Sequence, residues 1–161
     1  MPTIATICFL IDKKSKKLLL GMKKKGFGHG KYNGFGGKVE IGESIEEAAI
    51  RELYEECSIK VDIDCISKVA ELDFCFLEKE EWNQNVHVFV AENWSGEPKE
   101  SDEMIPEWFD YDKIPFENMW VDDIHWIPKI LEDKKIKGTF TFNKTGDIIS
   151  LMNVEEYSFD N

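Results

Sequence analysis

The stretch GKVEIGESIEEAAIRELYEECSI, residues 37–59, carries the strongest structural signal in the sequence. Ser44 and Glu47 have the S-x-x-E spacing of a capping box, which marks the start of a helix. At about 100° per residue, Ile50, Leu53 and Cys57 fall on one side of that helix. The pattern predicts a helix over residues 44–57 whose apolar side faces a core.

Three glutamates share a neighbouring side of this helix. Glu52 and Glu56 are four residues apart and Glu55 is three from Glu52, so their charges repel one another. Hard oxygen ligands on one face suit Mg²⁺ or Mn²⁺. A solvated acidic face is the commoner explanation of such a pattern. Arg51, the only arginine of the chain, lies inside the cluster, which favours a fixed carboxylate partner and a functional site.

The segment before the helix is rich in glycine. Residues 24–37 hold six of the eleven glycines, which predicts a loop. The run Gly34-Phe35-Gly36-Gly37-Lys38 would let the backbone approach a ligand closely. A tight loop without a ligand would have the same composition, so this signal is weak by itself.

The remaining elements indicate one α/β domain over residues 1–161. Alternating or β-rich runs predict a hairpin of residues 3–11 and 17–23, strands at 66–78, 86–92 and 105–111, and a closing hairpin of 138–143 and 148–152. A helical stretch should follow Asp122 and Asp123 and end near residue 134. Strands on both sides of a helix suggest a mixed sheet between helices.

Composition narrows the classes of partner. The formal net charge of the 161 residues is −12, and such a surface repels long nucleic acid but admits a small anion beside a metal or local cations. No stretch is long and apolar enough for a membrane span, and a secretory signal is not evident. The cysteines show no metal-binding spacing. We therefore expect a monomeric cytoplasmic protein with reduced thiols at Cys8, Cys57, Cys65 and Cys75.

The 37–59 segment resembles the signature box of the Nudix hydrolases, G-x5-E-x7-R-E-U-x-E-E-x-G-U, in which U is aliphatic. The matching residues are Gly37, Glu43, Arg51, Glu52, Leu53, Glu55, Glu56 and Ile59. Ser58 stands where the pattern has glycine. If the backbone there is left-handed, serine costs roughly 1 kcal/mol.

The resemblance implies a fold and a catalytic centre. The fold would be the Nudix α/β/α sandwich with a mixed β-sheet. The divalent metal, Mg²⁺ or Mn²⁺, would be bound by the Gly36 carbonyl and by Glu52, Glu55, Glu56 and Glu103. Arg51 would complete the catalytic set and, with Glu43, brace the loop against the helix.

A wider resemblance implies the substrate. Residues 21–39, 100–104 and 114–123 are similar to the Nudix enzymes that convert oxidised purine nucleoside triphosphates, such as 8-oxo-dGTP and 2-oxo-dATP, to monophosphate and pyrophosphate. It implies a substrate-binding set of Lys23, Phe27, Asn33, Phe35, Gly36, Gly37, Lys38, Phe74, Met104, Trp120, Asp122 and Asp123. Without the family, Trp120 would be interpreted as a core residue and the aspartates as a helix cap. Tyr32 and Gln84 depart from the related enzymes.

Two other functions stay open at this stage. One is a Nudix hydrolase of another nucleotide, such as a dinucleoside polyphosphate. The other is a Nudix-fold binding module without turnover, which would tolerate damage to the box. Here every carboxylate of the box is present, and Asn33 with Trp120 to Asp123 favours the oxidised purine.

Overall fold

The computed structural model describes residues 1–159. No helix in that part of the chain is both long and apolar enough to cross a membrane. The described cysteines, Cys8, Cys57, Cys65 and Cys75, are all free thiols, as expected. The strands are β1 Thr3–Asp12, β2 Lys17–Lys23, β3 Tyr32–Asn33, β4 Ile66–Phe76, β5 Gln84–Ala91, β6 Met104–Asp110, β7 Ile136–Phe142 and β8 Ile149–Glu156, and the helices are α1 Ile45–Cys57 and α2 Asp123–Leu131, with short 3-10 turns η1 Ile63–Cys65, η2 Glu80–Trp82, η3 Tyr111–Lys113 and η4 Phe116–Asn118.

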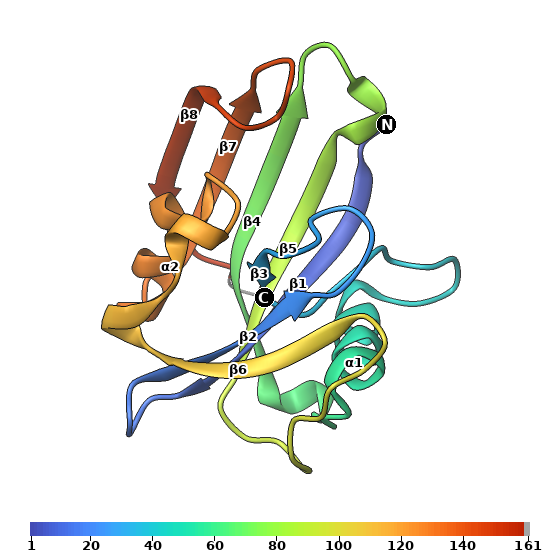
Figure 1. Ribbon diagram of the computed structural model, residues 1–161, viewed down its shortest axis with the longest axis vertical. Coiled ribbons are helices and arrows are strands. Elements are labelled where there is room, and N and C mark those ends of the chain that lie inside the picture. Colours follow the sequence, from blue (N-terminus) through green and yellow to red (C-terminus); the bar gives the residue numbers. More distant parts are fainter. Residues whose placement is uncertain (160–161) are drawn as a thin grey trace.

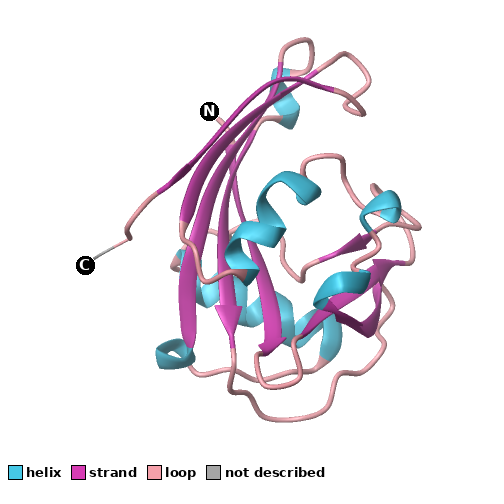
Figure 2. Ribbon diagram, turned by 90° about the vertical axis from the view of Figure 1, so that its left-hand side faces the viewer, coloured by secondary structure: helices cyan, strands magenta, loops and turns pink. Residues whose placement is uncertain are grey.

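The strands form the expected mixed sheet. Its order is β3-β2-β1-β5-β4-β7-β8, and β6 pairs with β2 (Figure 1). The β1–β5 and β4–β7 pairs are parallel, whereas the other pairs are antiparallel. Figure 2 shows the strong curvature of the sheet. The order places β1, on which the site is built, in the middle of the sheet.

Both faces of the sheet are buried, which produces the α/β/α sandwich. Along β1, Phe9 and Ile11 pack in a core with α2, whereas Cys8 and Leu10 pack in a second core with α1. Successive side chains of a strand point to opposite faces. Because each face must be covered, the sheet needs a helix on either side.

Helix α1 begins and ends as its sequence predicts. The Ser44 hydroxyl accepts a hydrogen bond from the Glu47 N–H, and the Glu47 side chain accepts one from the Ser44 N–H. At the other end, Ser58 takes the left-handed conformation (φ 65°). The predicted apolar side is partly shifted: Leu53 and Cys57 are fully buried, but Ile50 is only half-buried.

The other boundaries differ by a few residues. Helix α2 ends at Leu131 instead of near residue 134, because Asp133 adopts a left-handed backbone (φ 64°) that a helix cannot contain. Strand β8 continues to Glu156 instead of 152, because β7 already begins at Ile136 and supplies the pairing partner. These ladder bonds depend on residues distant in sequence, so a local pattern does not define them.

The loop before α1 takes the place of a strand. Strand β2 pairs with β1 only at residues 10–12 of β1, which leaves the rest of that edge open. Phe35 and Cys8 exchange backbone hydrogen bonds, and the Thr6 N–H donates to the Gly37 carbonyl at 2.9 Å. The glycine-rich loop is therefore held against the centre of the sheet.

Candidate active site

A cleft of about 660 Å³ opens on the α2 face of the sheet. It is bounded by the glycine-rich loop, the odd-numbered residues at the start of β1, the ends of β4 and β7, and the start of α2. The structure brings most of the predicted substrate-binding residues to this cleft together with one of the glutamates, namely Lys23, Phe27, Asn33, Gly36, Gly37, Lys38, Glu56, Phe74, Met104, Trp120, Asp122 and Asp123.

Two buried aspartates line the cleft. Asp122 and Asp123 are 4% and 6% exposed. The Asp122 Oδ2 accepts a hydrogen bond from the Trp126 Nε1–H at 2.8 Å. Neither the Asp122 carboxylate nor its neighbour caps the helix, since α2 has no side-chain cap bond. A role limited to helix capping is therefore not supported.

Burial controls the charge of this pair. Desolvation raises the pKa of Asp122, and desolvation together with repulsion from Asp122 raises the pKa of Asp123 well above its ordinary value. Two neighbouring carboxyl groups in a dry site do not both ionise easily. The pair therefore holds a proton to higher pH than a free aspartate does, and a carboxyl group that holds a proton can donate as well as accept a hydrogen bond.

Aromatic rings border the aspartates. Trp120 is half-buried and lines the cleft, so it is not a core tryptophan. Its ring stacks on Phe27 with centroids 5.1 Å apart and an interplanar angle of 24°, and Lys31 Nζ lies 5.2 Å from its centroid. A planar base entering beside Trp120 would have to displace the exposed Phe27 ring or stack next to it.

The glycine loop holds Glu56 in the lining of the cleft. Glu56 is 5% exposed, and its Oε1 accepts a hydrogen bond from the Gly36 N–H at 2.9 Å. Burial is the main cause that raises the pKa of Glu56 to about 8, and repulsion from Glu52 and Glu103 adds to it. A side chain at residue 36 would lie 1.8 Å from the Thr6 carbonyl oxygen, so only glycine allows this approach.

Arg51 binds the other glutamates of the helix and its preceding loop. Its Nη2 and Nε donate to the two Glu43 oxygens at 2.7 and 3.0 Å. Its Nη1 donates to Glu52 Oε1 at 2.9 Å and to Glu55 Oε1 at 3.0 Å. The Lys38 carbonyl accepts another bond from Nη2 at 3.2 Å. This bidentate network confirms the predicted carboxylate partner and braces the loop on α1.

The acidic residues have the right chemistry for a hard divalent cation but are not preassembled. Desolvation raises the pKa of Glu52, as it does for Glu56, and Glu103 contributes repulsion to both. A cation would relieve these costs. However, within residues 1–159, no three acidic, histidine or cysteine side chains form a ready-made metal site. Glu55 in particular is held by Arg51, so it would have to change partner to reach a cation.

Phe35 does not fit its predicted contact with substrate. Its side chain is fully buried in the α1 core with Leu53 and Cys57, on the face opposite the cleft. The reason is strand parity: Phe35 pairs with Cys8, whose side chain points to the α1 face. Arg51, Glu52, Glu55 and Glu103 also lie outside the cleft lining. Of these, Glu52 and Glu103 are close enough to Glu56 for their charges to repel its carboxylate.

The cleft contains residues that sequence reasoning missed. Trp82 packs on Phe27 and Phe76, and Phe76 stacks on Phe142 with centroids 4.8 Å apart. Phe76 could have been found, because it is two residues from Phe74 and so shares its face of the strand. No local signal marks Trp82, which reaches the cleft from the 3-10 turn η2.

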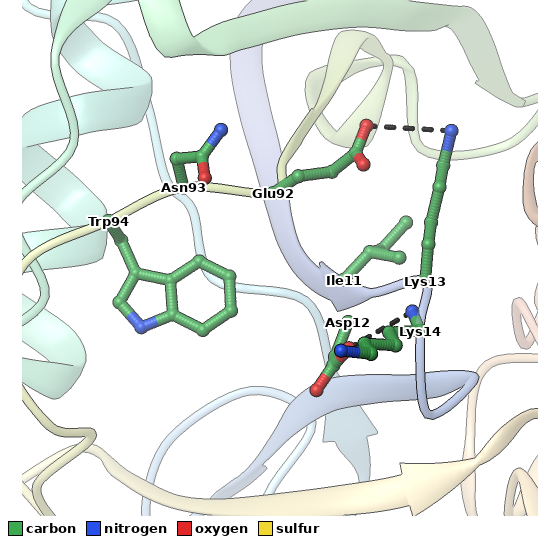
Figure 3. A pocket seen from close by; sticks show the side chains of 7 residues that line it. All are labelled: Ile11, Asp12, Lys13, Lys14, Glu92, Asn93 and Trp94. Atoms are coloured by element: carbon green, nitrogen blue, oxygen red, sulfur yellow. Dashed lines mark hydrogen bonds and ion pairs between the residues drawn. The ribbon is translucent and has the colours of Figure 1, made fainter.

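A second, smaller depression lies at the far end of β1 and is less suitable as a site (Figure 3). Two of its charged side chains pair with each other or with a neighbour: Lys13 pairs with Glu92 at 3.4 Å and with Asp133 at 2.8 Å. Asp12 accepts hydrogen bonds from the backbone of Lys14 and Ser15. We therefore assign the activity to the larger cleft.

The fold and the box define a Nudix protein: residues 1–130 match the NUDIX domain, and the chain belongs to that family. The chain is 55% identical over 126 residues to the oxidized purine nucleoside triphosphate hydrolase of zebrafish (Danio rerio), covering 78% of this chain and 79% of that protein. It is 43% identical to the mouse (Mus musculus) protein of the same name, covering 99% of this chain and 100% of that protein. The crystal structure of the mutator MutT protein from Bacillus halodurans superposes with a TM-score of 0.78 at 26% identity, covering 95% of this chain and 97% of that one.

Proposed function

We propose that this protein hydrolyses oxidised purine nucleoside triphosphates to the monophosphate and pyrophosphate, with Mg²⁺ as cofactor. The observation that carries the proposal is the set of groups that line one cleft. A buried aspartate pair beside Trp120 lines it together with Lys23 and Glu56. The aspartates and the indole suit a purine, and the lysine and the glutamate suit a phosphate chain with a cation. The names of the zebrafish and mouse relatives support the same substrate class.

The aspartate pair and Asn33 suit an oxidised base. Oxidation of guanine at C8 turns the N7 acceptor into an N–H donor. The aspartate pair can accept from purine N–H groups, and Asn33 offers a donor and an acceptor. When buried polar groups are paired by one ligand and left unpaired by another, each mismatch costs roughly 1–3 kcal/mol. The cleft therefore has the means to prefer 8-oxo-dGTP over dGTP.

The glutamates around Gly36, together with Lys23, suit metal-assisted hydrolysis. Glu52, Glu55, Glu56, Glu103 and the Gly36 carbonyl would hold the cation, which polarises the anhydride and lowers the pKa of the attacking water. The Gly36 N–H fixes the Glu56 carboxylate within the cleft. Arg51 fixes Glu52 and the loop at Lys38. Lys23, which also lines the cleft, would offset the negative charge of the phosphates.

The test is steady-state pyrophosphate release with Mg²⁺ for 8-oxo-dGTP, 2-oxo-dATP, dGTP and diadenosine tetraphosphate. We expect kcat/KM for 8-oxo-dGTP to exceed that for dGTP by at least about tenfold, the equivalent of one unpaired polar group. Asn33→Ala should narrow that ratio. Trp120→Ala should weaken all purine substrates alike, because it removes the aromatic face.

Asn93→Ala is the matched control, since Asn93 is exposed in the smaller depression and should leave the ratio unchanged. Equal kcat/KM for dGTP and 8-oxo-dGTP would reject the oxidised-purine substrate. A clear preference for diadenosine tetraphosphate would assign the protein to the hydrolases of dinucleoside polyphosphates instead.

A further inference from the structure

Glu103 lies in a loop before β6, whereas the other predicted metal-binding glutamates lie on helix α1. Residues 100–103 precede β6, whose last pairing with β2 joins Met104 to Lys23. Glu103 is exposed, and its charge acts on both Glu52 and Glu56. Whatever holds this loop therefore decides whether the Glu103 carboxylate stays close enough to act on Glu52 and Glu56.

Lys24 makes three contacts with the loop. Its Nζ donates to Glu100 Oε2 at 2.5 Å and to the Ser101 carbonyl at 3.0 Å. Its backbone N–H donates to the Glu103 carbonyl at 2.8 Å. The side chain of Lys24 is 33% exposed, so these bonds are partly shielded from water. The residue that directly follows β2 thus anchors the loop at its beginning and at its end.

The loop between these anchors is itself a tight turn. Ser101 Oγ accepts hydrogen bonds from the N–H groups of Glu103 and Met104, at 3.3 and 3.2 Å. The Ser101 N–H donates to the Met104 carbonyl at 3.0 Å. Because the turn is internally bonded, holding Ser101 in place also holds Glu103.

We propose that Lys24 is a positioning residue for the metal site: it docks the loop 100–103 on the end of β2 and so keeps Glu103 beside Glu52 and Glu56. This inference rests on the proposed metal-dependent function, because it assigns Glu103 to the cation. Lys24 itself does not line the cleft. Its effect on metal binding passes entirely through Glu103.

Mn²⁺ binding without substrate tests this directly. The free Mn²⁺ signal in electron paramagnetic resonance gives Kd for wild type, Lys24→Met, Glu103→Gln and the double variant. We expect Lys24→Met to raise the Kd for Mn²⁺ by about threefold to tenfold, within the range of coupled neighbouring groups. In the Glu103→Gln background, Lys24→Met should not raise the Kd for Mn²⁺ any further. Lys24→Arg, which keeps the positive charge of the side chain, should retain most of the affinity for Mn²⁺.

Lys25→Met is the matched control, because Lys25 is the exposed neighbour and should not alter Kd. Glu100→Gln provides a second way to weaken the anchor should Lys24→Met fold poorly, and it should raise Kd as well. An unchanged Kd for Mn²⁺ in both Lys24→Met and Glu100→Gln would overturn the inference while leaving the proposed function intact. So would a rise in Kd on Lys24→Met that is equally large in wild type and in the Glu103→Gln background. Wild-type protein that binds no Mn²⁺ would instead overturn the metal-dependent function itself.

Discussion

Replacing Glu56 by glutamine should separate its cost to folding from its value to catalysis. Glu56 is nearly inaccessible, and when it is ionised its charge is repelled by Glu52 and Glu103, whereas its carboxylate accepts a hydrogen bond from the Gly36 N–H. Glutamine has the same shape, and its amide oxygen can accept the same bond. The substitution therefore removes the charge and little else.

The size of the effect follows from the pKa of Glu56, which burial raises from 4.5 to about 8 in the folded protein. A tenfold change in proton affinity corresponds to about 1.4 kcal/mol, so ionised Glu56 costs the metal-free folded state on the order of 3–5 kcal/mol. Because the folded state binds the proton more tightly, this loss is absent below about pH 4.5 and grows until about pH 8. Wild type should therefore lose stability relative to Glu56→Gln as the pH rises through that window.

Chemical unfolding in a chelator at about pH 5 and about pH 9 measures the difference. We expect Glu56→Gln to be more stable than wild type by about 3–5 kcal/mol at the higher pH and nearly equal at the lower pH. Mg²⁺ should stabilise wild type and not the variant, and the turnover of the variant should fall by orders of magnitude. Glu55→Gln is the comparison, since the Glu55 side chain is half exposed and should show no such pH-dependent gain. Equal stability of Glu56→Gln and wild type at the higher pH, or undiminished turnover, would refute the reasoning.

Three further outcomes are expected. Ser58→Gly should raise the free energy of unfolding by about 1 kcal/mol in urea denaturation, because the residue has a left-handed backbone (φ 65°) that serine adopts at a cost; an unchanged or lower value would contradict this. Asp122→Asn and Asp123→Asn should each shift the pH profile of kcat/KM, because burial raises the pKa of both carboxyls and each substitution removes one member of the pair that shares a proton; two profiles that superimpose on wild type would exclude a shared proton. His87→Gln should reduce the loss of stability on acidification from pH 7 in thermal unfolding, because burial lowers the pKa of His87 below 6.5, so that the unfolded chain takes up the proton first as the pH falls. The groups around His87 are Asn85 of its own strand, Lys68, Glu71 and Asp73 of β4, and Glu46 of α1. If the variant loses stability on acidification as much as wild type does, the group that titrates is not His87.

The sequence by itself determined the elements whose interactions are local. The capping box of Ser44 and Glu47 and the apolar repeat of Leu53 and Cys57 depend on contacts within one or two helical turns, and the structure has the predicted helix. The same holds for the hairpin of β1 and β2. The spacing of the box residues also matches the Nudix signature, and residues three or four apart on a helix are neighbours in any fold.

Only the tertiary structure decided which of these residues meet across the cleft. Phe35 and Gly36 are neighbours in sequence, yet pairing with β1 sends the Phe35 side chain into the α1 core and brings the Gly36 N–H to Glu56. Trp82 reaches the cleft because the segment between the end of β4 and the start of β5 lies there, and Lys24 meets Glu100 across 76 residues of chain. The charge state of the aspartate pair likewise follows from burial, which depends on packing between distant segments. Local patterns specify which face of an element is apolar, but register and packing determine what that face meets.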